Sequence, residues 1–599
     1  MRTLFFAALC ALYAVQAGAV ELAKFIDRKA VVFVHVPDFP VLLKQFEKSP
    51  LSKTARDEKV KKFFAPALAK MDLPGWDEKQ KASTGLSYTD LLALPKGEVL
   101  LAVVDGEAKA TPLLLVEVGE ENGAKVNDFI RQALNQRNND ERQITISEET
   151  IGDVTLHEAT VVRKVQPPKP QPGDVPTEKP EPQTSNDSLQ WFVREGVLVF
   201  GEGKKDVTQV AISLSQGGAT DPLSQADSYI RSVDRVQGQG LGLTVDFNQI
   251  APAVRRHLAK QPQPAQKNPI TDPENLLRTS GIDELDTLYA AFRFEDQAMV
   301  SEAGLRYRNF SGLVTLFPLG QGPVPQPEFV PEGWLAVNSF RLKLGDVFSG
   351  IEGLFQAHHP AAAALFSGNL AMTNAKVGFD VKRDLFGSFG DEVIMASVAR
   401  PGVPIDRISA FDIDDFYSLS VADAKTLATV LDSLLKQMDP QNKGLIAKKE
   451  FGGSVIHSIP MPPDPVRGQR FINLCLWQDK LFISIGTTSP IEAAILTATR
   501  KDTNFWQRED VQRALAETPA DAGGFAFQDN RVMLAMLMET FVRVAEMAAR
   551  EGKAEQAPLV DPAAQPDISD LAKYWAPSQG YFKRDASGIH VVSKLPYIQ

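Results

Sequence analysis

The stretch Gly152-Asp153-Val154-Thr155-Leu156-His157 has a counterpart 300 residues later, Gly452-Gly453-Ser454-Val455-Ile456-His457. In both copies two turn-forming residues precede an alternating apolar and polar run, which is the pattern of a β-hairpin. Further matches keep the same order along the chain. They are Asp90 to Val99 with Asp384 to Val393, Gln225 and Gly242 with Gln507 and Gly524, and Gly304 to Leu313 with Gly580 to Ile589.

These ordered matches predict an internal duplication, because chance similarities would not follow one order. Repeat 1 is expected to span residues 20–318 and repeat 2 residues 333–599. Residues 319–332 between them are rich in Pro and Gly, which predicts a semi-stiff linker. The equivalence of His157 with His457, and of Gly312 with Gly588, is the test of the duplication.

The periodicity of each predicted repeat indicates the α+β class. Residues 98–104 and 112–118 alternate like strands around a polar turn, and residues 392–398 repeat the first of them. The apolar residues of 126–134 and of 427–435 recur at helical spacing. Strands joined by short turns must be antiparallel. We therefore expect a largely antiparallel sheet with helices packed on one face in each repeat.

The first 19 residues read as a signal peptide. Arg2 gives a positive start, residues 4–15 are apolar, and Ala17-Gly18-Ala19 is a small-residue cleavage site. Cys10 follows the bulky Leu9, so we do not expect lipidation. No later run is long enough to span a membrane, so no transmembrane anchor is expected. The sequence thus predicts a periplasmic or secreted protein.

The charge and the cysteine content limit the classes of partner and of chemistry to expect. The formal net charge is −11, and the basic residues are scattered rather than clustered, so nucleic acid is not an expected partner. Cleavage after Ala19 would leave Cys475 as the single cysteine, which forbids an intrachain disulfide. Its apolar surroundings predict a buried side chain rather than a reactive thiol. The oligomeric state is left open.

Repeat 1 contains an insertion at residues 166–188 that has no counterpart of equal length in repeat 2. It carries seven prolines and almost no apolar residue. Because proline cannot join a β-ladder and so polar a segment cannot bury much surface, we expect a mobile surface excursion.

The sequence contains no recognisable catalytic, metal-binding or cofactor-binding pattern. None of the seven histidines has zinc-ligand spacing, and neither a nucleophile elbow nor a phosphate loop is present. His157 and His457 are weak candidates for a site because both repeats carry them. A duplication copies structural residues too, and a half-buried strand histidine is the expected reading.

The apolar helix predicted from Val532 differs from its counterpart around residues 250–258. Four of the eleven methionines lie between Met533 and Met547. Met533 and Met536 are therefore the second pair of weak candidates. Two readings are open: a deeply buried helix, or an adaptable methionine-rich contact surface.

The chain resembles exported bacterial proteins that carry a tandem domain of unknown function. The resemblance rests on a polar helix near Gln225 or Gln507, followed by a strand at residues 242–247 or 524–529. It implies export and α+β architecture, and it assigns no functional residue.

The absence of a catalytic pattern favours a non-enzymatic exported binding or scaffold protein whose partner, a protein or a small molecule, is unknown. Two alternatives stay open. One is a hydrolase whose site assembles from scattered Asp, Glu and His residues, which a pocket gathering two or more titratable groups would favour. The other is a structural component of the cell envelope, which self-association at micromolar concentration would favour.

Overall fold

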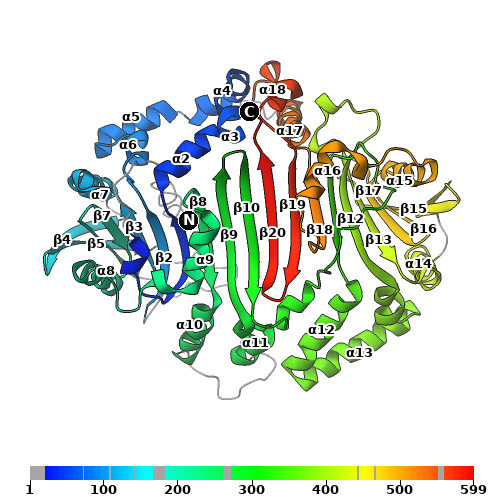
Figure 1. Cartoon of the computed structure of the whole chain (residues 1–599), viewed down its shortest axis with the longest axis horizontal. Coiled ribbons are helices and arrows are strands. Elements are labelled where there is room, and N and C mark those ends of the chain that lie inside the picture. Colours follow the sequence, from blue (N-terminus) through cyan, green and yellow to red (C-terminus); the bar gives the residue numbers. More distant parts are fainter. Residues whose placement is uncertain are drawn as a thin grey trace, which may run out of the picture. The chain divides into compact units, whose positions relative to one another are not determined.

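The structure is a computed structural model. It describes residues 21–71, 73–106, 110–139, 142–165, 183–260, 272–440, 444–464, 467–550 and 559–598 (Figure 1). The expected signal peptide, and residues 166–182 of the proline-rich insertion, lie outside these ranges. The α+β class is confirmed: helices and antiparallel strands alternate along the chain.

The chain forms two compact units, each assembled from more than one stretch of sequence. Unit 1 contains Met1–Lys48, Leu68–Ala253 and Thr287–Glu295. Unit 2 contains Ser49–Ala67, Val254–Asp286 and Asp296–Gln599. Unit 2 therefore includes three pieces of the predicted repeat 1, residues 49–67, 254–286 and 296–318.

The sheet of unit 1 has antiparallel neighbours throughout, as the short turns predict. Its spatial order is β4 (Arg142–Ile151), β5 (Val154–Val165), β6 (Gln183–Arg194), β7 (Val197–Gly201), β3 (Ala110–Glu117), β2 (Val99–Asp105), β1 (Ala30–Val36), β8 (Gly240–Asp246) and β9 (Leu285–Glu295).

The sheet of unit 2 is antiparallel as well. Its order is β14 (Ala447–Phe451), β15 (Ser454–Pro460), β16 (Phe471–Trp477), β17 (Lys480–Gly486), β13 (Ile413–Val421), β12 (Phe389–Ala399), β11 (Ala336–Arg341), β18 (Gly524–Gln528), β19 (Ser578–Asp585), β20 (Gly588–Pro596) and β10 (Ala298–Tyr307).

The nine strands β1–β9 and the nine strands β11–β19 thus pair in the same order. Their registers also coincide. We take Val99 and Val393 as equivalent and follow the paired residues from strand to strand. The same steps lead to His157 opposite Trp191 in unit 1, and to His457 opposite Leu474 in unit 2. The common order and register support an internal duplication, which itself stays a prediction.

Two of the sequence matches are wrong as equivalences. Gly304 lies on β10, whereas Gly580 lies on β19, which takes the place of β9 in its series. Gly312 follows β10, but Gly588 begins β20, so these two glycines also fail the test set for them. The match of Gly242 with Gly524 is wrong by one residue, because in the ladders the position equivalent to Gly242 is that of Phe525.

The predicted linker, residues 319–332, is packed at its second half. Phe329 and Val330 are buried in the core of unit 2, and the Val330 carbonyl accepts a hydrogen bond from the Phe505 amide at 2.9 Å. In unit 1 the Ile26 carbonyl accepts from the Leu223 amide at 2.8 Å in the same place. These residues are therefore the lead-in to β11, as residues 22–26 are to β1.

Helices connect the strands and cover them. Those of unit 1 are α2 (Phe39–Lys48), α5 (Leu73–Thr84), α6 (Tyr88–Leu92), α7 (Gly123–Asn135), α8 (Lys204–Gln216) and α9 (Asp227–Val236). Those of unit 2 are α3 (Pro50–Arg56), α11 (Pro273–Ser280), α12 (Leu344–His358), α13 (Pro360–Val377), α14 (Ala424–Met438), α15 (Ser489–Arg500), α16 (Glu509–Ala516), α17 (Asn530–Arg550) and α18 (Ile568–Ala572). Helices α4 (Glu58–Met71) and α10 (Phe247–Lys260) contribute residues to both units. Both predicted amphipathic helices, α7 and α14, are confirmed.

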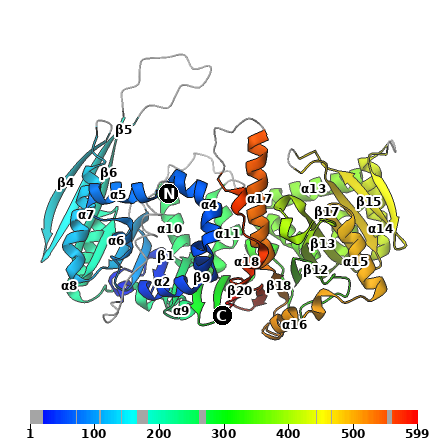
Figure 2. The same ribbon diagram turned by 90° about the horizontal axis from the view of Figure 1, so that it is seen from above.

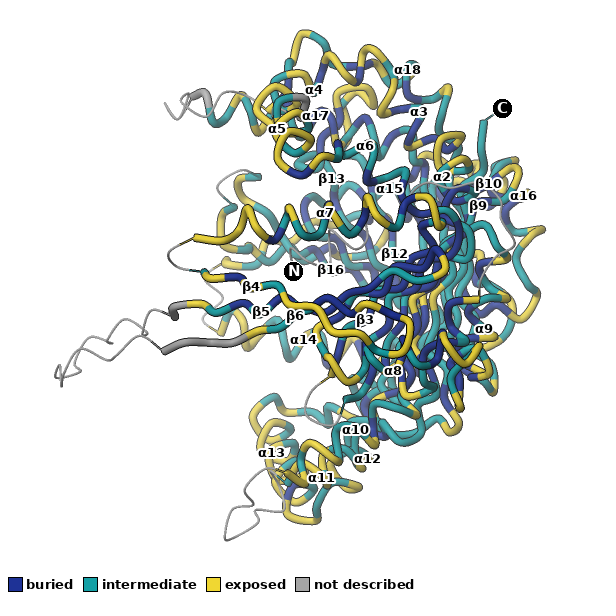
Figure 3. Tube along the Cα trace, turned by 90° about the vertical axis from the view of Figure 1, so that its left-hand side faces the viewer, coloured by how far each residue is buried: buried dark blue, intermediate teal, exposed yellow. Residues whose placement is uncertain are grey.

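Each unit has a core of its own, and buried residues concentrate along the strands (Figure 3). In unit 1, α8 buries Val207, Val210 and Leu214 at helical spacing in one cluster with strand residues such as Leu115. In unit 2, α15 buries Ile491 and neighbours in one cluster with Phe416 and Phe482.

A buried carboxylate joins the beginning of the described chain to the core of unit 1. Glu98 is 4% exposed. Its side chain accepts hydrogen bonds from the Leu22 amide at 2.6 Å and from the Tyr229 hydroxyl at 3.1 Å, and it lies 3.3 Å from Nε2 of His35. Burial, and then the charge of Glu98, raise the pKa of Tyr229, which therefore stays protonated and can donate.

We expect Glu98→Ala to lower the free energy of unfolding by about 3–5 kcal/mol, because it removes the acceptor that the buried Leu22 amide and Tyr229 hydroxyl share. The ladder register makes Glu392 the matched control. Its side chain is 35% exposed and lies 3.3 Å from Lys480, so Glu392→Ala should cost about 0–1 kcal/mol. Equilibrium urea denaturation measures both. Equal losses would contradict a stabilising role of the buried network.

Candidate functional site

His157, on β5, is built into the packing of unit 1. Its ring stacks on Trp191 with centroids 5.2 Å apart, and Nδ1 lies 3.0 Å from the Arg131 guanidinium and 3.5 Å from Glu148. Burial, followed by the charge of Arg131, lowers the pKa of His157. A neutral imidazole stacked on tryptophan is a structural arrangement.

His457, on β15, lies in unit 2 opposite Leu474. It is half-buried, and its Nδ1 atom is buried with no hydrogen-bond partner among the described residues. Burial, and then the charge of Lys448, lower its pKa. The two histidines thus share a ladder position but not their surroundings, since Arg131 and Glu148 lie at His157 whereas the charges of Lys448 and Asp432 act on His457.

The lowered pKa values set the sign of a pH dependence. In the unfolded chain a histidine titrates near pH 6.5, about its ordinary pKa, whereas the folded chain binds these two protons less readily. The unfolded state therefore holds more protons below about pH 6.5, and the free energy of unfolding falls as the pH falls.

We expect the double substitution His157→Gln and His457→Gln to reduce this loss of stability. Thermal unfolding at about pH 7.5 and about pH 5.5 measures it, with exposed His257→Gln as the control. An acid-induced drop in Tm that is the same in the double variant and the parent would contradict the assignment.

The methionine-rich helix α17 is packed on two sides in unit 2. Met538 is 2% exposed and clusters with Val542 and with Phe63 of α4, while Met536 packs beside Ile408 and Val532 in another cluster. Met533 is half-buried. This environment favours the buried-helix reading over an adaptable surface, and Met533 and Met536 are not brought to a common site.

We expect Met538→Ala to lower the free energy of unfolding by about 2–5 kcal/mol, because it leaves a cavity between packed helices. Its neighbour Leu537 is 49% exposed, so Leu537→Ala should change stability by no more than about 0.5 kcal/mol. Chemical denaturation of the two variants measures the difference. A Met538→Ala variant as stable as the parent would instead favour the adaptable methionine-rich contact surface.

Cys475, on β16, is 1% exposed, and burial raises the pKa of its thiol to about 11. The thiol is therefore protonated at neutral pH and shielded from solvent, which fits the expected buried role and not a nucleophile.

In unit 2, the helix pair α17 and α18 holds a third helix. Val60 and Phe63 of α4 are buried in one cluster with Ala535 and Val542 of α17 and Leu571 of α18. Figure 2 shows α17 standing beside α18.

The contact also has a polar rim. Lys59 pairs with Asp570 at 2.7 Å, Lys573 pairs with Asp57 at 2.7 Å, and the Trp575 indole donates to Thr54 at 2.7 Å. We call this arrangement the α17–α18 clasp.

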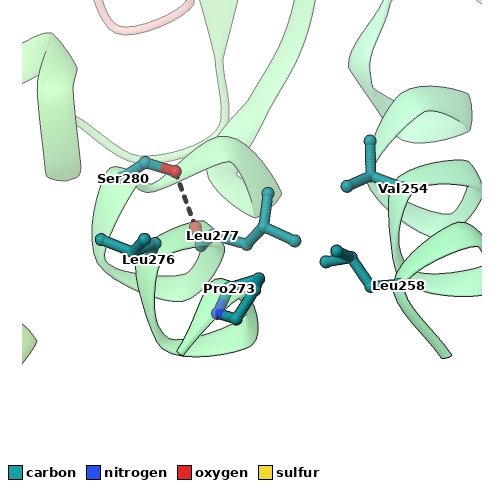
Figure 4. A pocket seen from close by; sticks show the side chains of 6 residues that line it. All are labelled: Val254, Leu258, Pro273, Leu276, Leu277 and Ser280. Atoms are coloured by element: carbon teal, nitrogen blue, oxygen red, sulfur yellow. Dashed lines mark hydrogen bonds between the residues drawn. The ribbon is translucent and has the colours of Figure 1, made fainter. Parts of the chain in front are cut away.

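The helix pair α10 and α11 occupies the same place in the first strand series, because both pairs connect the eighth strand to the ninth. An open apolar groove lies between these two helices, with a volume of about 360 Å³. It is lined by Val254, Leu258, Pro273, Leu276, Leu277 and Ser280 (Figure 4). The polar side chain of the lining is that of Ser280, and its hydroxyl already donates to the Leu277 carbonyl at 2.7 Å. The wall of this α10–α11 groove is therefore almost wholly apolar.

An ion-pair cluster fixes the two walls of the groove. Arg255, on α10, donates to Glu274 of α11 at 2.9 Å and to Asp283 at 2.5 Å. Leu276 is 49% exposed, so one wall presents a large apolar side chain to the open side. The exposed residues Arg256, His257 and Lys260 make the adjoining end of α10 basic.

The groove was not predicted from the sequence. The only signal is local: Val254 and Leu258 are four residues apart on one helix, and Leu276 and Leu277 lie on the next. That the two apolar faces leave a gap depends on how the helices pack, which no local pattern encodes.

Within the described ranges, no group of three or more His, Cys, Asp or Glu residues could hold a metal ion, and no helix combines the length and the hydrophobicity that spanning a membrane requires. No family model, curated protein or solved structure matches the chain.

Proposed function

We propose that this is an exported, non-enzymatic binding or scaffold protein that captures a helical segment of a partner protein in the α10–α11 groove. The observation that carries the proposal is the α17–α18 clasp. There a helix pair at the same place in its strand series holds an amphipathic helix of the same chain, with Phe63 fully buried. The α10–α11 groove offers an apolar surface of the same kind, and within the described part of the chain it is open.

The occupant of the clasp indicates what the groove would take. Helix α4 inserts Val60, Phe63 and Phe64, which follow one another at i, i+3 and i+4. An amphipathic helix with apolar anchors at this spacing is a common ligand of helical grooves.

Charge selects further among such helices. In the clasp the bound helix is basic and Asp570 pairs with its Lys59. Beside the groove the exposed end of α10 carries Arg256, His257 and Lys260, so an acidic amphipathic helix is the preferred partner.

The hydrolase alternative gains nothing from this groove. A hydrolytic site needs titratable side chains that converge on a reacting atom. The six lining residues contain none.

The test uses a fluorescent synthetic peptide with the sequence of residues 57–70 in which the lysines are replaced by glutamates. We expect it to bind the full-length protein, as measured by fluorescence anisotropy. Leu276→Asp should weaken binding at least tenfold, equivalent to about 1.4 kcal/mol, because it places a charge in the apolar wall. Leu276 is exposed, so its substitution should leave the fold intact, and circular dichroism checks this.

The matched control is Ile405→Asp, at a site of similar exposure in unit 2 away from the groove lining. It should leave the affinity unchanged. Absence of binding by both the acidic peptide and its lysine parent, or an equal effect of the two substitutions, would refute the proposal.

A further inference from the structure

Of the strands that the structure describes, β10 and β20 belong to neither nine-strand series. β10 follows β9 along the chain after a two-residue turn, and β20 follows β19 after a turn of the same length. Each is therefore the tenth strand of its series. Within unit 2 they pair with each other in an antiparallel ladder of nine residue pairs, from Ala298 opposite Pro596 to Arg306 opposite Gly588 (Figure 1).

The register of this ladder is twofold symmetric. The pairing of β8 with β9, and of β18 with β19, makes Ala291 equivalent to Tyr581. Because the two turns are equally long, the equivalence continues into the tenth strands and matches Glu302 with Val592. These two residues lie directly opposite each other. A rotation by half a turn about this point therefore exchanges β10 and β20, and any other register would place unlike positions at the centre.

Helices of unit 2 make a second pair of contacts between the series. The indole of Trp575, just after α18 of the second series, donates to Thr54 of α3 in the first series at 2.7 Å. In the opposite sense, Asn275 of α11 in the first series donates at 2.7 Å to the carbonyl of His358, the last residue of α12 in the second series. Each series thus binds a helix that lies between the first and second strands of the other.

The two bound helices are held at equivalent positions. The pairing of the first strand with the second makes Val36 equivalent to Phe340. Thr54 and His358 lie equally far along the chain from these two residues. The helices that bind them, α18 and α11, are equivalent as well, because both precede the ninth strand. One twofold rotation therefore accounts for the ladder and for both helix contacts.

We propose that unit 2 is organised around an isologous interface, in which each half of the chain is the partner of the other. The first half ends at Gln321 and the second begins at Gly322. Each half supplies a tenth strand, a binding helix and a helical arm, and it receives the same three elements in return. The surface formed by β10 and α11 thus fits a second copy of the same kind of half, and the peptide linker is not needed to hold the halves together.

The contacts between the halves are those of a stable interface. Phe63, from the first half, is fully buried in the cluster formed with α17 and α18 of the second. The charges are complementary, since Lys59 pairs with Asp570 and Asp57 pairs with Lys573, each at 2.7 Å. A ladder combined with a buried apolar cluster is typical of permanent rather than transient interfaces.

The two helical arms differ beyond their equivalent anchor points. After Thr54 the first arm continues into α4, which fills the α17–α18 clasp. After His358 the second arm continues into α13 (Pro360–Val377), whose Phe366 stacks on Phe355 of α12 with centroids 4.7 Å apart. The isologous interface therefore does not depend on whether the α10–α11 groove binds a ligand.

Cleavage of the full-length protein between its halves tests the interface. A protease recognition sequence is inserted after the exposed Gln321, and the folded protein is then cleaved there. We expect the two fragments to elute together in size-exclusion chromatography at micromolar concentration and to separate in denaturant. Fragments that separate in native buffer would refute the proposal.

Substitutions at the interface should loosen the cleaved complex. Phe63→Asp places a charge in the buried cluster, and in Gly588→Val the added Cβ would lie 2.5 Å from the Leu305 carbonyl oxygen of β10. Each should raise the dissociation rate of the fragments at least tenfold, as measured by exchange with a fluorescently labelled fragment. Leu365→Asp, at a position of α13 that is 63% exposed, is the matched control and should leave the rate unchanged. Circular dichroism of the uncleaved variants checks the fold, and equal rates in all three variants would contradict the interface.

Paired cysteines test the twofold register. Ser301→Cys with Ser593→Cys, and the symmetry-related Ala303→Cys with Val591→Cys, should each link the two fragments on oxidation, because both pairs lie opposite each other in the ladder. The mismatched combination of Ser301→Cys with Val591→Cys should not. Cys475 is buried and does not compete. A link in one matched pair without the other, or equal linking of the mismatched pair on a non-reducing gel, would contradict the twofold arrangement.

Discussion

The register of the antiparallel ladders is the constraint on which the rest of each unit depends. Side chains alternate between the two faces of a strand, so a shift of one residue would exchange the buried and exposed sets. In unit 1 this register buries Phe33 and Leu100, and it sets Trp191 opposite His157. It also fixes where each strand ends, and therefore where each connecting helix begins. The helix pairs α10–α11 and α17–α18 owe their common position to the same ladders.

The two strand series share this backbone order, but they differ in the surroundings of equivalent side chains and helices. Glu98 and Glu392 hold the same ladder position, but one is buried among Leu22, His35 and Tyr229, and the other is half-exposed beside Lys480. The helix pairs differ in the same way, since α4 fills one and no helix among the described residues fills the other. A common backbone order with divergent helices is compatible with the proposed binding scaffold, because a shared sheet can supply the stability while the helices differ in their contacts.

Much of the fold could be predicted because its signals are local. The hairpin at Gly152-Asp153 and the amphipathic helices α7 and α14 follow from periodicity within short windows, and the ladder equivalence of His157 with His457 follows from the match of two six-residue segments. The match of Gly304 with Gly580 is wrong for a related reason. Strand-and-turn segments resemble each other in any antiparallel sheet, and only the pairing shows that β19 takes the place of β9.

What the sequence could not predict depends on long-range packing. Phe329 and Val330 lie in a segment whose prolines indicate a linker, yet the unit 2 core covers them. The α10–α11 groove is likewise a gap between two helices, not a property of either.

The α17–α18 clasp has a consequence for how the chain folds. Its ion pair between Lys59 and Asp570 joins residues 511 positions apart, and the buried Phe63 packs in one cluster with residues of α17. The closure entropy of so long a loop grows only slowly with its length, so the contact is thermodynamically affordable. Its kinetics differ, because contacts of high sequence separation form late. During synthesis from the N-terminus, Val60, Phe63 and Phe64 are made long before their partners, and an exposed apolar segment of this kind favours association with other chains.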